Sequence, residues 1–175
     1  MSEGIFFSSP APRDALMPEV ARLARLDEAL PQIEAVLATE TDAVAIEATL
    51  ACLLWDTLAH VNFCGFYRRI GATTLAVGPY QGSMGCLRID FGRGVCGAAA
   101  RTREVQIVDD VHAFPGHIAC DSRSRSELVI PVVAGGELRA VLDVDSPFPA
   151  AFGRAEADRI EALVARTLGR AGVVF

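Results

Sequence analysis

Three cysteines with unusual neighbours are the residues of this sequence best suited to chemistry. Cys86 and Cys96 occur in the glycine-rich stretch GPYQGSMGCLRIDFGRGVCG, and Cys120 occurs in the polar stretch DVHAFPGHIACDSRSRSE. A cysteine that only fills a core behaves as a small apolar residue within a periodic apolar segment. Glycine and polar neighbours are more typical of a reactive sulfur, so thiol redox chemistry is the first hypothesis.

A reactive cysteine requires partial exposure and a positive potential that favours the thiolate. Positive charge near Cys120 in the sequence comes from four residues: His112, His117, Arg123 and Arg125. A thiol that reduces an oxidised substrate becomes a sulfenic acid, which condenses with a second thiol to form a disulfide. Cys86 and Cys96 are both candidates for that second thiol, and the residues alone do not choose between them.

Acidic and aromatic side chains could complete a site for a small zwitterion. In the segment LDVDS, Asp143 and Asp145 project from the same side of a strand and lie roughly 7 Å apart. With Glu127 they could bind an ammonium group, or donate a proton to a leaving oxygen if burial raised one pKa. Candidate walls of an apolar pocket that contacts a methyl or thioether group are Phe63, Tyr67 and Tyr80.

The elements that position these residues are those of an α+β domain. Strands are expected at VNFCGFYRR, TTLAVG, CLRID, VQIVD, ELVIPVVA and ELRAVLDVDS. Gly135 and Gly136 predict a tight hairpin between the last two. A loop over 110–125 precedes that hairpin, and a loop of this length in a compact domain is usually functional or disordered. Its histidines, phenylalanine and cysteine favour an active-site lid.

Helical periodicity appears in four places. Over 16–37, Pro18 and Pro31 predict one helix followed by a second short one. A helix capped by Thr41 or Asp42 follows. Its expected buried stripe consists of Val44, Ala48, Ala51, Trp55 and Leu58. Glycines predict a tight entry into a short helix over 98–101. A final amphipathic helix carries on one face Ile160, Leu163, Val164 and Leu168.

Length, composition and charge restrict the class of protein. A chain of 175 residues with 51% hydrophobic residues suits one domain, which buries about 70% of the surface of its unfolded form. A net charge of -6 disfavours a nucleic-acid partner. Glu3 and a short apolar run over 5–7 are unlike a signal peptide, and no apolar stretch is long enough for a membrane span. These features predict a cytoplasmic protein with reduced thiols.

Other residues have simpler interpretations. Cys52, in an apolar helix, and Cys64, in a strand, are expected to fill the core. His112 and His117 are interpreted as loop-bracing residues and stay outside the catalytic set. The segment GRGVCG lacks the Lys and Ser/Thr of a phosphate-binding loop, so no nucleotide cofactor is expected. A zinc site formed by the cysteines and a histidine is disfavoured by the wide cysteine spacing, so no metal is expected.

Five segments contain the three cysteines and most of the candidate binding residues: HVNFCGFYRR, GPYQGSMGC, GRGVCG, DVHAFPGHIACDSRSRSE and LDVDS. Together they resemble the free methionine-(R)-sulfoxide reductases, which are built on a single GAF domain. The most specific element is the three-cysteine pattern combined with the loop HAFPGHIACD, because GAF domains in general carry no such cysteines. The resemblance extends over residues 16–175.

The resemblance implies a single GAF domain over 16–175. Residues 1–15 precede the resemblance and match no part of the family, and we expect them to form a flexible arm. The expected fold is α+β, with a mainly antiparallel six-stranded sheet, helices packed on one face, and a lid loop over the ligand pocket. It further implies a homodimer and no cofactor. Because GAF domains commonly bind small ligands, a non-catalytic sensor of a small molecule or an oxidant is the alternative function.

The implied activity is thioredoxin-dependent reduction of free L-methionine (R)-S-oxide. By resemblance, Cys120 attacks the sulfoxide sulfur, Cys86 resolves the sulfenic acid, and Cys96 is an auxiliary resolving or pocket-closing thiol. Backbone amides of the loops would hold the substrate carboxylate.

The substrate-binding residues are implied in the same way. Glu127, Asp143 and Asp145 match acidic positions of the family that bind substrate, and Tyr67 matches its pocket tyrosine. Phe63 departs from the family, which usually has a tryptophan at this position. A phenylalanine keeps the apolar wall but offers less area to the substrate methyl group.

Overall fold

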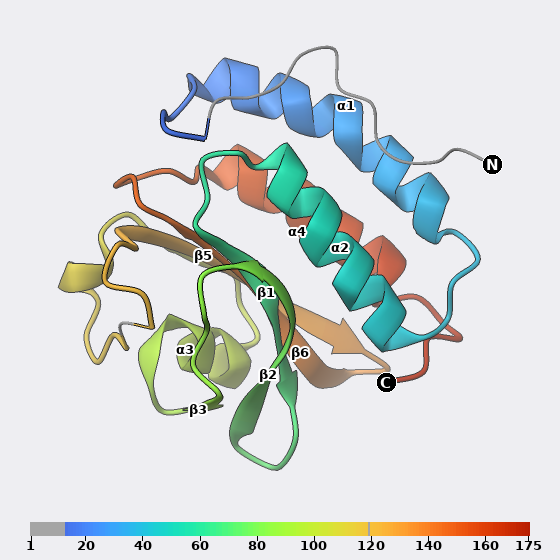
Figure 1. Ribbon diagram of the computed structural model, residues 1–175. Helices are drawn as coiled ribbons and strands as arrows, with labels where there is room; N and C mark the ends of the chain where they lie inside the picture. Colours follow the sequence, from blue (N-terminus) through green and yellow to red (C-terminus); the bar gives the residue numbers. More distant parts are fainter. Residues whose placement is uncertain (1–12, 119) are drawn as a thin grey trace.

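A six-stranded antiparallel sheet organises the protein (Figure 1). The computed structural model describes residues 13–118 and 120–175. Its strands are β1 (Phe63–Arg69), β2 (Thr74–Gly82), β3 (Arg88–Asp90), β4 (Gln106–Val108), β5 (Ser126–Ala134) and β6 (Glu137–Ser146). They lie in the order β3-β2-β1-β6-β5-β4, and each neighbouring pair is antiparallel. The expected six-stranded antiparallel sheet is confirmed.

Both faces of the sheet are covered by other parts of the chain. Because successive side chains of a strand point to opposite faces, each strand can contribute to a core on either side. On β1, Cys64 and Phe66 belong to one hydrophobic core, whereas Phe63 and Tyr67 belong to a second core on the opposite face. The first core lies under three helices. The second core is smaller and borders the candidate site.

Three helices cover the first face: α1 (Glu19–Leu37), α2 (Ala43–Thr57) and α4 (Arg154–Thr167). In Figure 1, α2 and α4 lie along the sheet, and α1 packs against them on the outside. The fourth helix, α3 (Gly94–Thr102), lies on the other face, where Cys96, Ala99 and Ala100 pack into the second core. The expectation that the helices pack on one face is therefore correct for α1, α2 and α4 and wrong for α3.

The first helix differs from its expected form. Instead of two helices divided at Pro31, α1 is continuous, and Pro18 is its N-cap residue. A proline inside a helix removes one backbone hydrogen bond. Pro31 lies on the solvent side of α1, where water can bond the carbonyl that loses its partner.

The buried face of α2 also differs from its expected stripe. Asp42 caps the helix by accepting a hydrogen bond from Ala45 N, as one of the two expected caps. Ala51 and Leu58 are buried as expected, and Trp55 is partly buried, but Val44 and Ala48 are exposed. The helix buries instead Ile46, Leu50 and Leu54. Because apolar residues occur on several sides of α2, the pattern did not select one face.

The two cysteines that were expected to fill the core differ in their exposure to solvent. Cys64 is buried in β1, as expected, whereas Cys52 is exposed on α2. The expectation for Cys52 is therefore wrong. This error has the same cause as the wrong buried stripe, because the sequence pattern did not show which face of α2 packs on the sheet.

The remaining elements follow the expected order. The hairpin between β5 and β6 turns at Gly135 and Gly136, whose φ angles are 60° and 78°. The expected short helix over 98–101 is longer, since α3 already begins at Gly94. The loop over 110–125 contains a short 3-10 helix, η1 (Val111–Ala113). On the last helix, Ile160, Leu163, Val164 and Leu168 are buried as expected.

Most of the proposed N-terminal arm over 1–15 lies outside the described residues. Arg13, which is described, places its guanidinium 4.4 Å from the centre of the Trp55 ring and donates a hydrogen bond to the Trp55 carbonyl. Among the described helices, none has the length and apolar character needed to cross a membrane.

Candidate active site

Cys86 and Cys120 form a disulfide, with their Cα atoms 5.4 Å apart. Cys86 lies in the loop between β2 and β3, and Cys120 lies in the loop between η1 and β5. The bond therefore joins two loops that are 34 residues apart in sequence. Cys96 is a free thiol, buried on α3. Of the two thiols considered as partners for Cys120, the structure pairs Cys86 with it.

A cavity opens beside this disulfide, between α3, the two loops and the second face of the sheet. It encloses about 480 Å³, including the part open to solvent. Cys120 and Cys96 contribute to its lining, and so do the five residues expected to bind substrate: Phe63, Tyr67, Glu127, Asp143 and Asp145. The structure thus gathers these expected residues around one cavity.

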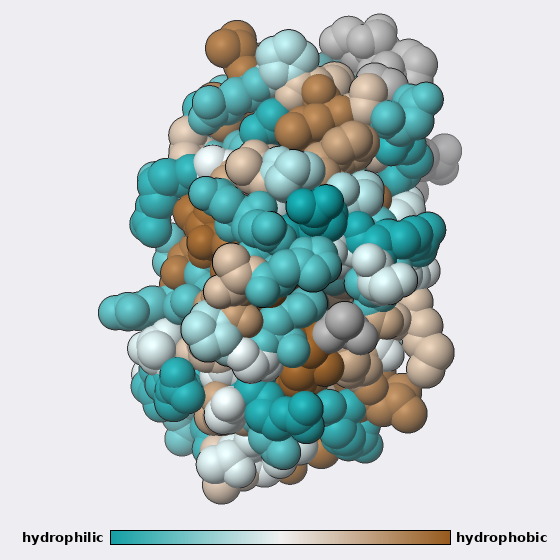
Figure 2. Space-filling model, turned by 90° about the vertical axis from the view of Figure 1, so that its left-hand side faces the viewer, coloured by the Kyte–Doolittle hydropathy of each residue, from teal (hydrophilic) through white to brown (hydrophobic). Residues whose placement is uncertain are grey.

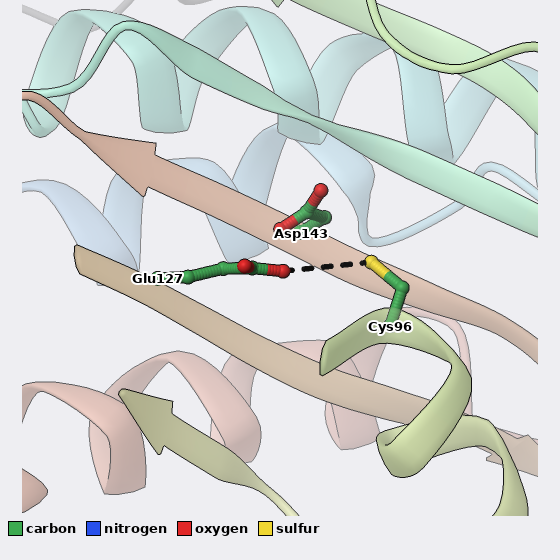
Figure 3. Close-up of side chains that lie close together, drawn as sticks. All are labelled: Cys96, Glu127 and Asp143. Carbon is green, nitrogen blue, oxygen red and sulfur yellow. Dashed lines mark hydrogen bonds between the residues drawn. The ribbon is translucent and has the colours of Figure 1, made fainter. Parts of the chain in front are cut away.

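The acidic residues come from two paired strands. Glu127 of β5 lies opposite Asp145 of β6, and Asp143 is two residues away on the same strand. Cys96 approaches from α3, and its Sγ is 3.9 Å from Glu127 Oε1 (Figure 3). Figure 3 shows Cys96, Glu127 and Asp143 pointing toward one another. Two carboxyl groups and a thiol therefore meet in a space largely closed to water.

Burial is the main influence on the acidity of these carboxyl groups. Desolvation raises the pKa of Asp143 to about 7. The pKa of Glu127 and that of Asp145 are raised well above the usual range, first by burial and then by the neighbouring Asp143 carboxylate. The site therefore holds carboxylic acids that keep protons near neutral pH. This property is the one that the sequence analysis required of a proton donor.

Burial has a corresponding effect on Cys96. Desolvation, followed by the nearby carboxylates of Asp143 and Glu127, raises the pKa of this thiol well above its usual value. A cysteine attacks as the thiolate, so Cys96 is poorly suited to nucleophilic attack in this environment. Its ligand atom and those of Glu127 and Asp143 lie within 4.8 Å of one another. A cysteine binds a metal as the thiolate, and burial disfavours the thiolate of Cys96, so this cluster is poorly suited to a metal ion.

Aromatic rings form one wall of the cavity. The ring of Phe63 lies 6.0 Å from that of Tyr67 and 5.4 Å from that of Tyr80, measured between ring centres. The loop that carries Cys86 lies directly against this wall. A Cβ atom added at Gly85 would be 2.6 Å from the Tyr67 hydroxyl and 3.1 Å from the Phe63 ring. Glycine is therefore required beside Cys86 for this close approach.

Asp121, which follows Cys120 directly, attaches the Cys120 loop to the rest of the site. Its carboxylate accepts hydrogen bonds from the Asn62 amide at 3.0 Å, the Ser83 hydroxyl at 2.5 Å, and the Arg123 guanidinium at 2.8 Å. These donors, Arg123 first, hold the pKa of Asp121 below its usual range. The sequence analysis missed this residue, although its position next to a site cysteine was a possible signal.

The expected source of positive potential around Cys120 is largely paired with other groups. Arg123 bonds to Asp121, and His112 lies 2.9 Å from Asp110. Asp110 is also 3.9 Å from Arg125. The charges of these residues are therefore offset by carboxylates, in contrast to the expectation from sequence.

Of the two histidines, only His117 lines the cavity. Its Nε2 atom lies 3.9 Å from Glu127 Oε2, and burial lowers the pKa of its ring. The sequence analysis left His117 outside the site, so its place on the cavity wall is a finding of the structure. His112 is exposed and contacts Asp110, which agrees with a role in bracing the loop.

Comparisons with known proteins support the assignment suggested by this geometry. A GAF domain model matches residues 32–171. The free methionine-R-sulfoxide reductase of Escherichia coli is 46% identical over 69% of this chain and 70% of its own length. The enzyme of that name from Saccharomyces cerevisiae is 38% identical over 69% of this chain and 71% of its own length.

A solved structure agrees with this result. The free methionine-R-sulfoxide reductase from Neisseria meningitidis, in complex with its substrate, is 38% identical to this chain. The TM-score is 0.82, and the match covers 94% of this chain and 92% of that one. The present chain therefore belongs to the GAF-domain family and, within it, to the group of the free methionine-R-sulfoxide reductases.

Proposed function

We propose that this protein reduces free L-methionine (R)-S-oxide to L-methionine by thiol chemistry. The observation that carries the proposal is the position of the Cys86–Cys120 disulfide at a cavity lined by three carboxyl groups, two of them buried. A disulfide beside a small polar cavity is the oxidised product that a two-thiol reductase leaves after one turnover. The relatives named free methionine-R-sulfoxide reductase support the choice of substrate.

We assign substrate recognition to the acidic and aromatic residues that line the cavity. Asp143 is 5% exposed, and its Oδ1 atom has no hydrogen-bond partner among the described residues. A buried acceptor without a partner costs free energy, which a substrate ammonium group would relieve. Glu127 and Asp145 are placed beside Asp143 for the same group. Phe63 and Tyr67 would contact the methyl end, and backbone N–H groups of the surrounding loops would hold the carboxylate.

The first chemical step is attack of the Cys120 thiolate on the sulfoxide sulfur. This attack joins Sγ to the sulfoxide sulfur, and a carboxylic acid of the site protonates the sulfoxide oxygen. The resulting hydroxyl group then moves to Sγ, as its bond to the substrate sulfur and the bond between the two sulfur atoms both break. Methionine is then released, and Cys120 becomes a sulfenic acid. The raised pKa values of Asp143, Glu127 and Asp145 support this role, because such acids retain a proton at neutral pH.

The second step closes the disulfide. Sγ of Cys86 attacks the sulfenic sulfur of Cys120, the S–O bond breaks, and water leaves after protonation of the oxygen. A dithiol of the thioredoxin class then reduces the disulfide and completes the cycle. A homodimeric assembly is proposed by family resemblance alone and is tested by sedimentation of the full chain.

Single-turnover measurements test this mechanism. The reduced wild-type chain, mixed with free L-methionine (R)-S-oxide without a reductant, is expected to release about one methionine per chain. We expect Cys120→Ser to release none, because the attacking sulfur is absent. Cys86→Ser is expected to give one methionine but no recycling by thioredoxin. Equal methionine yields from wild type and Cys120→Ser would contradict the assignment.

The same experiment separates a reductase from a GAF sensor. A sensor would bind the sulfoxide and return it unchanged, so no methionine would form and the thiol count would not fall. An assay with the separated epimers completes the test. A reductase of the proposed specificity consumes the R epimer and leaves the S epimer.

A further inference from the structure

The loop that carries Cys86 presents apolar side chains to solvent on both sides of that cysteine. Met84 is 69% exposed and Leu87 is 61% exposed. Tyr80, at the end of β2, is 38% exposed, and its ring stacks on Phe63, which in turn touches the loop at Gly85. An exposed group of large apolar side chains next to a reactive bond is typical of a protein-binding surface.

Other large apolar residues are exposed on other elements, such as Val20 and Val36 on α1 and Ile70 on the β1–β2 turn, so exposure alone does not single out this group. Its distinguishing feature is its position, because Met84 and Leu87 lie on either side of Cys86, which belongs to the one disulfide among the described residues. Figure 2 shows one face of the molecule, on which hydrophilic side chains predominate and hydrophobic ones occur in separate areas.

The two sulfur atoms of the disulfide differ in their surroundings. Cys120 belongs to the lining of the cavity, whereas Cys86 does not and packs partly buried against the second core. Cys86 and Cys120 are both partly exposed, so exposure alone does not separate the two sulfur atoms. Cys86 lies outside the cavity lining, on the same loop as the exposed Met84 and Leu87, and is therefore the sulfur nearer in sequence to a partner bound on that loop.

We propose that Tyr80, Met84 and Leu87 form the docking surface for a protein dithiol of the thioredoxin class, and that this dithiol attacks Cys86. The inference rests on the proposed function, because it concerns the reduction that follows methionine release. It adds to that function the surface used by the reductant and the sulfur atom that is attacked.

The exchange is balanced in two steps. The partner's first thiolate forms a bond to Sγ of Cys86, the Cys86–Cys120 bond breaks, and Cys120 leaves as a thiolate at the cavity. The partner's second thiolate then attacks its own sulfur in the mixed disulfide, and Cys86 leaves as a thiolate. The partner becomes a disulfide, and two electrons have passed to this chain. This order restores the attacking thiolate of Cys120 first.

A substitution at Leu87 tests the docking surface, because Leu87 does not line the cavity. With thioredoxin as the reductant, Leu87→Asp is expected to raise KM for thioredoxin by about tenfold, as for a central apolar contact of an interface. The rate supported by dithiothreitol should remain that of wild type, since a small dithiol does not need the surface. Ile70→Asp, at a similarly exposed residue on the β1–β2 turn, is the matched control and should leave both rates unchanged.

A trapping experiment tests the attacked sulfur on the wild-type chain and does not depend on the folding of a variant. The oxidised chain is mixed with a thioredoxin whose second active-site cysteine is replaced by serine, so that the mixed disulfide accumulates. Peptide mass mapping is expected to find thioredoxin on Cys86. Finding it mainly on Cys120 would overturn the proposed direction of attack.

The single-turnover yield of methionine distinguishes the two proposals. If the reduced chain forms no methionine, the proposed function fails. If methionine forms but Leu87→Asp keeps the wild-type KM for thioredoxin, only the docking surface is wrong.

Discussion

At the scale of single residues, the thiols of the site differ in solvent access and in ionisation. Cys86 and Cys120 are partly exposed and bonded to each other, whereas Cys96 is buried among carboxyl groups. The cysteine count and the glycine-rich context indicated thiol chemistry but left two candidate partners for Cys120. The structure selects Cys86 because two loops meet there.

The raised pKa of Cys96 leads to a prediction about its reactivity. In the reduced native chain, iodoacetamide is expected to modify Cys96 more than about tenfold more slowly than the exposed Cys52, because alkylation requires a reachable thiolate. Mass spectrometry of peptides over time measures both rates in one sample. Buried Cys64 should behave as Cys96 does. Labelling of Cys96 as fast as that of Cys52 would show that the thiol is accessible and ionised.

At the scale of elements, α3 brings Cys96 to the cavity by lying very close to the sheet. A Cβ atom at Gly97 would be 2.5 Å from the carbonyl oxygen of Asp90, at the end of β3. Glycine is thus needed for the contact between α3 and β3, and the sequence analysis recognised only its role in the entry to the helix. The face on which α3 lies was not visible from the pattern, because a short Ala-rich helix has no strong preference for either face.

A substitution pair tests this contact. Gly97→Ala is expected to lower the free energy of unfolding by about 1–3 kcal/mol, because the added methyl group forces α3 away from Asp90. Gly92→Ala is the control, since a Cβ atom there would meet nothing within 4 Å. Urea denaturation measures both changes. If Gly97→Ala lowers the free energy of unfolding no more than Gly92→Ala does, α3 can move away from Asp90 without cost and the contact is not required.

At the scale of the whole molecule, the two faces of the sheet have different tasks. The large core under α1, α2 and α4 consists of apolar side chains, and the buried carboxylates on that side, Glu47 and Glu156, each have an arginine partner. The second core encloses carboxyl groups whose ionised forms are disfavoured by burial. Burying these carboxyl groups beside the cavity costs free energy of folding, and the apolar burial in the first core must offset that cost.

This cost predicts a pH dependence of stability. The pKa of Asp143 is about 7 in the folded chain and near 3.8 when unfolded, so between these values the folded state binds more protons. Its contribution therefore makes the folded state less stable as pH rises from about 4 to 7. Asp143→Asn removes that contribution. Between pH 5 and pH 7.5, the free energy of unfolding of the variant should therefore increase relative to that of wild type by on the order of 2 kcal/mol.

Denaturation at several pH values, with Asp109→Asn at an exposed residue as the control, provides the measurement. His60 acts in the opposite direction, because burial lowers its pKa to about 4, but its effect is common to both chains and cancels in the comparison. A difference between Asp143→Asn and wild type that does not change with pH would contradict the raised pKa.

The sequence by itself determined the strands, the Gly135–Gly136 hairpin, the final helix, and Cys96, Cys120 and the five expected binding residues that line the cavity, but not Asp121 or His117. These features depend on local alternation, turn chemistry and short motifs, all of which are present in a few neighbouring residues. Only the tertiary structure decided the bonding of Cys86 to Cys120, the exposure of Cys52, the face covered by α3 and the protonation of the buried acids. Each of these depends on which distant segments exclude water from a side chain or come within bonding distance, and such contacts exist only in the folded chain.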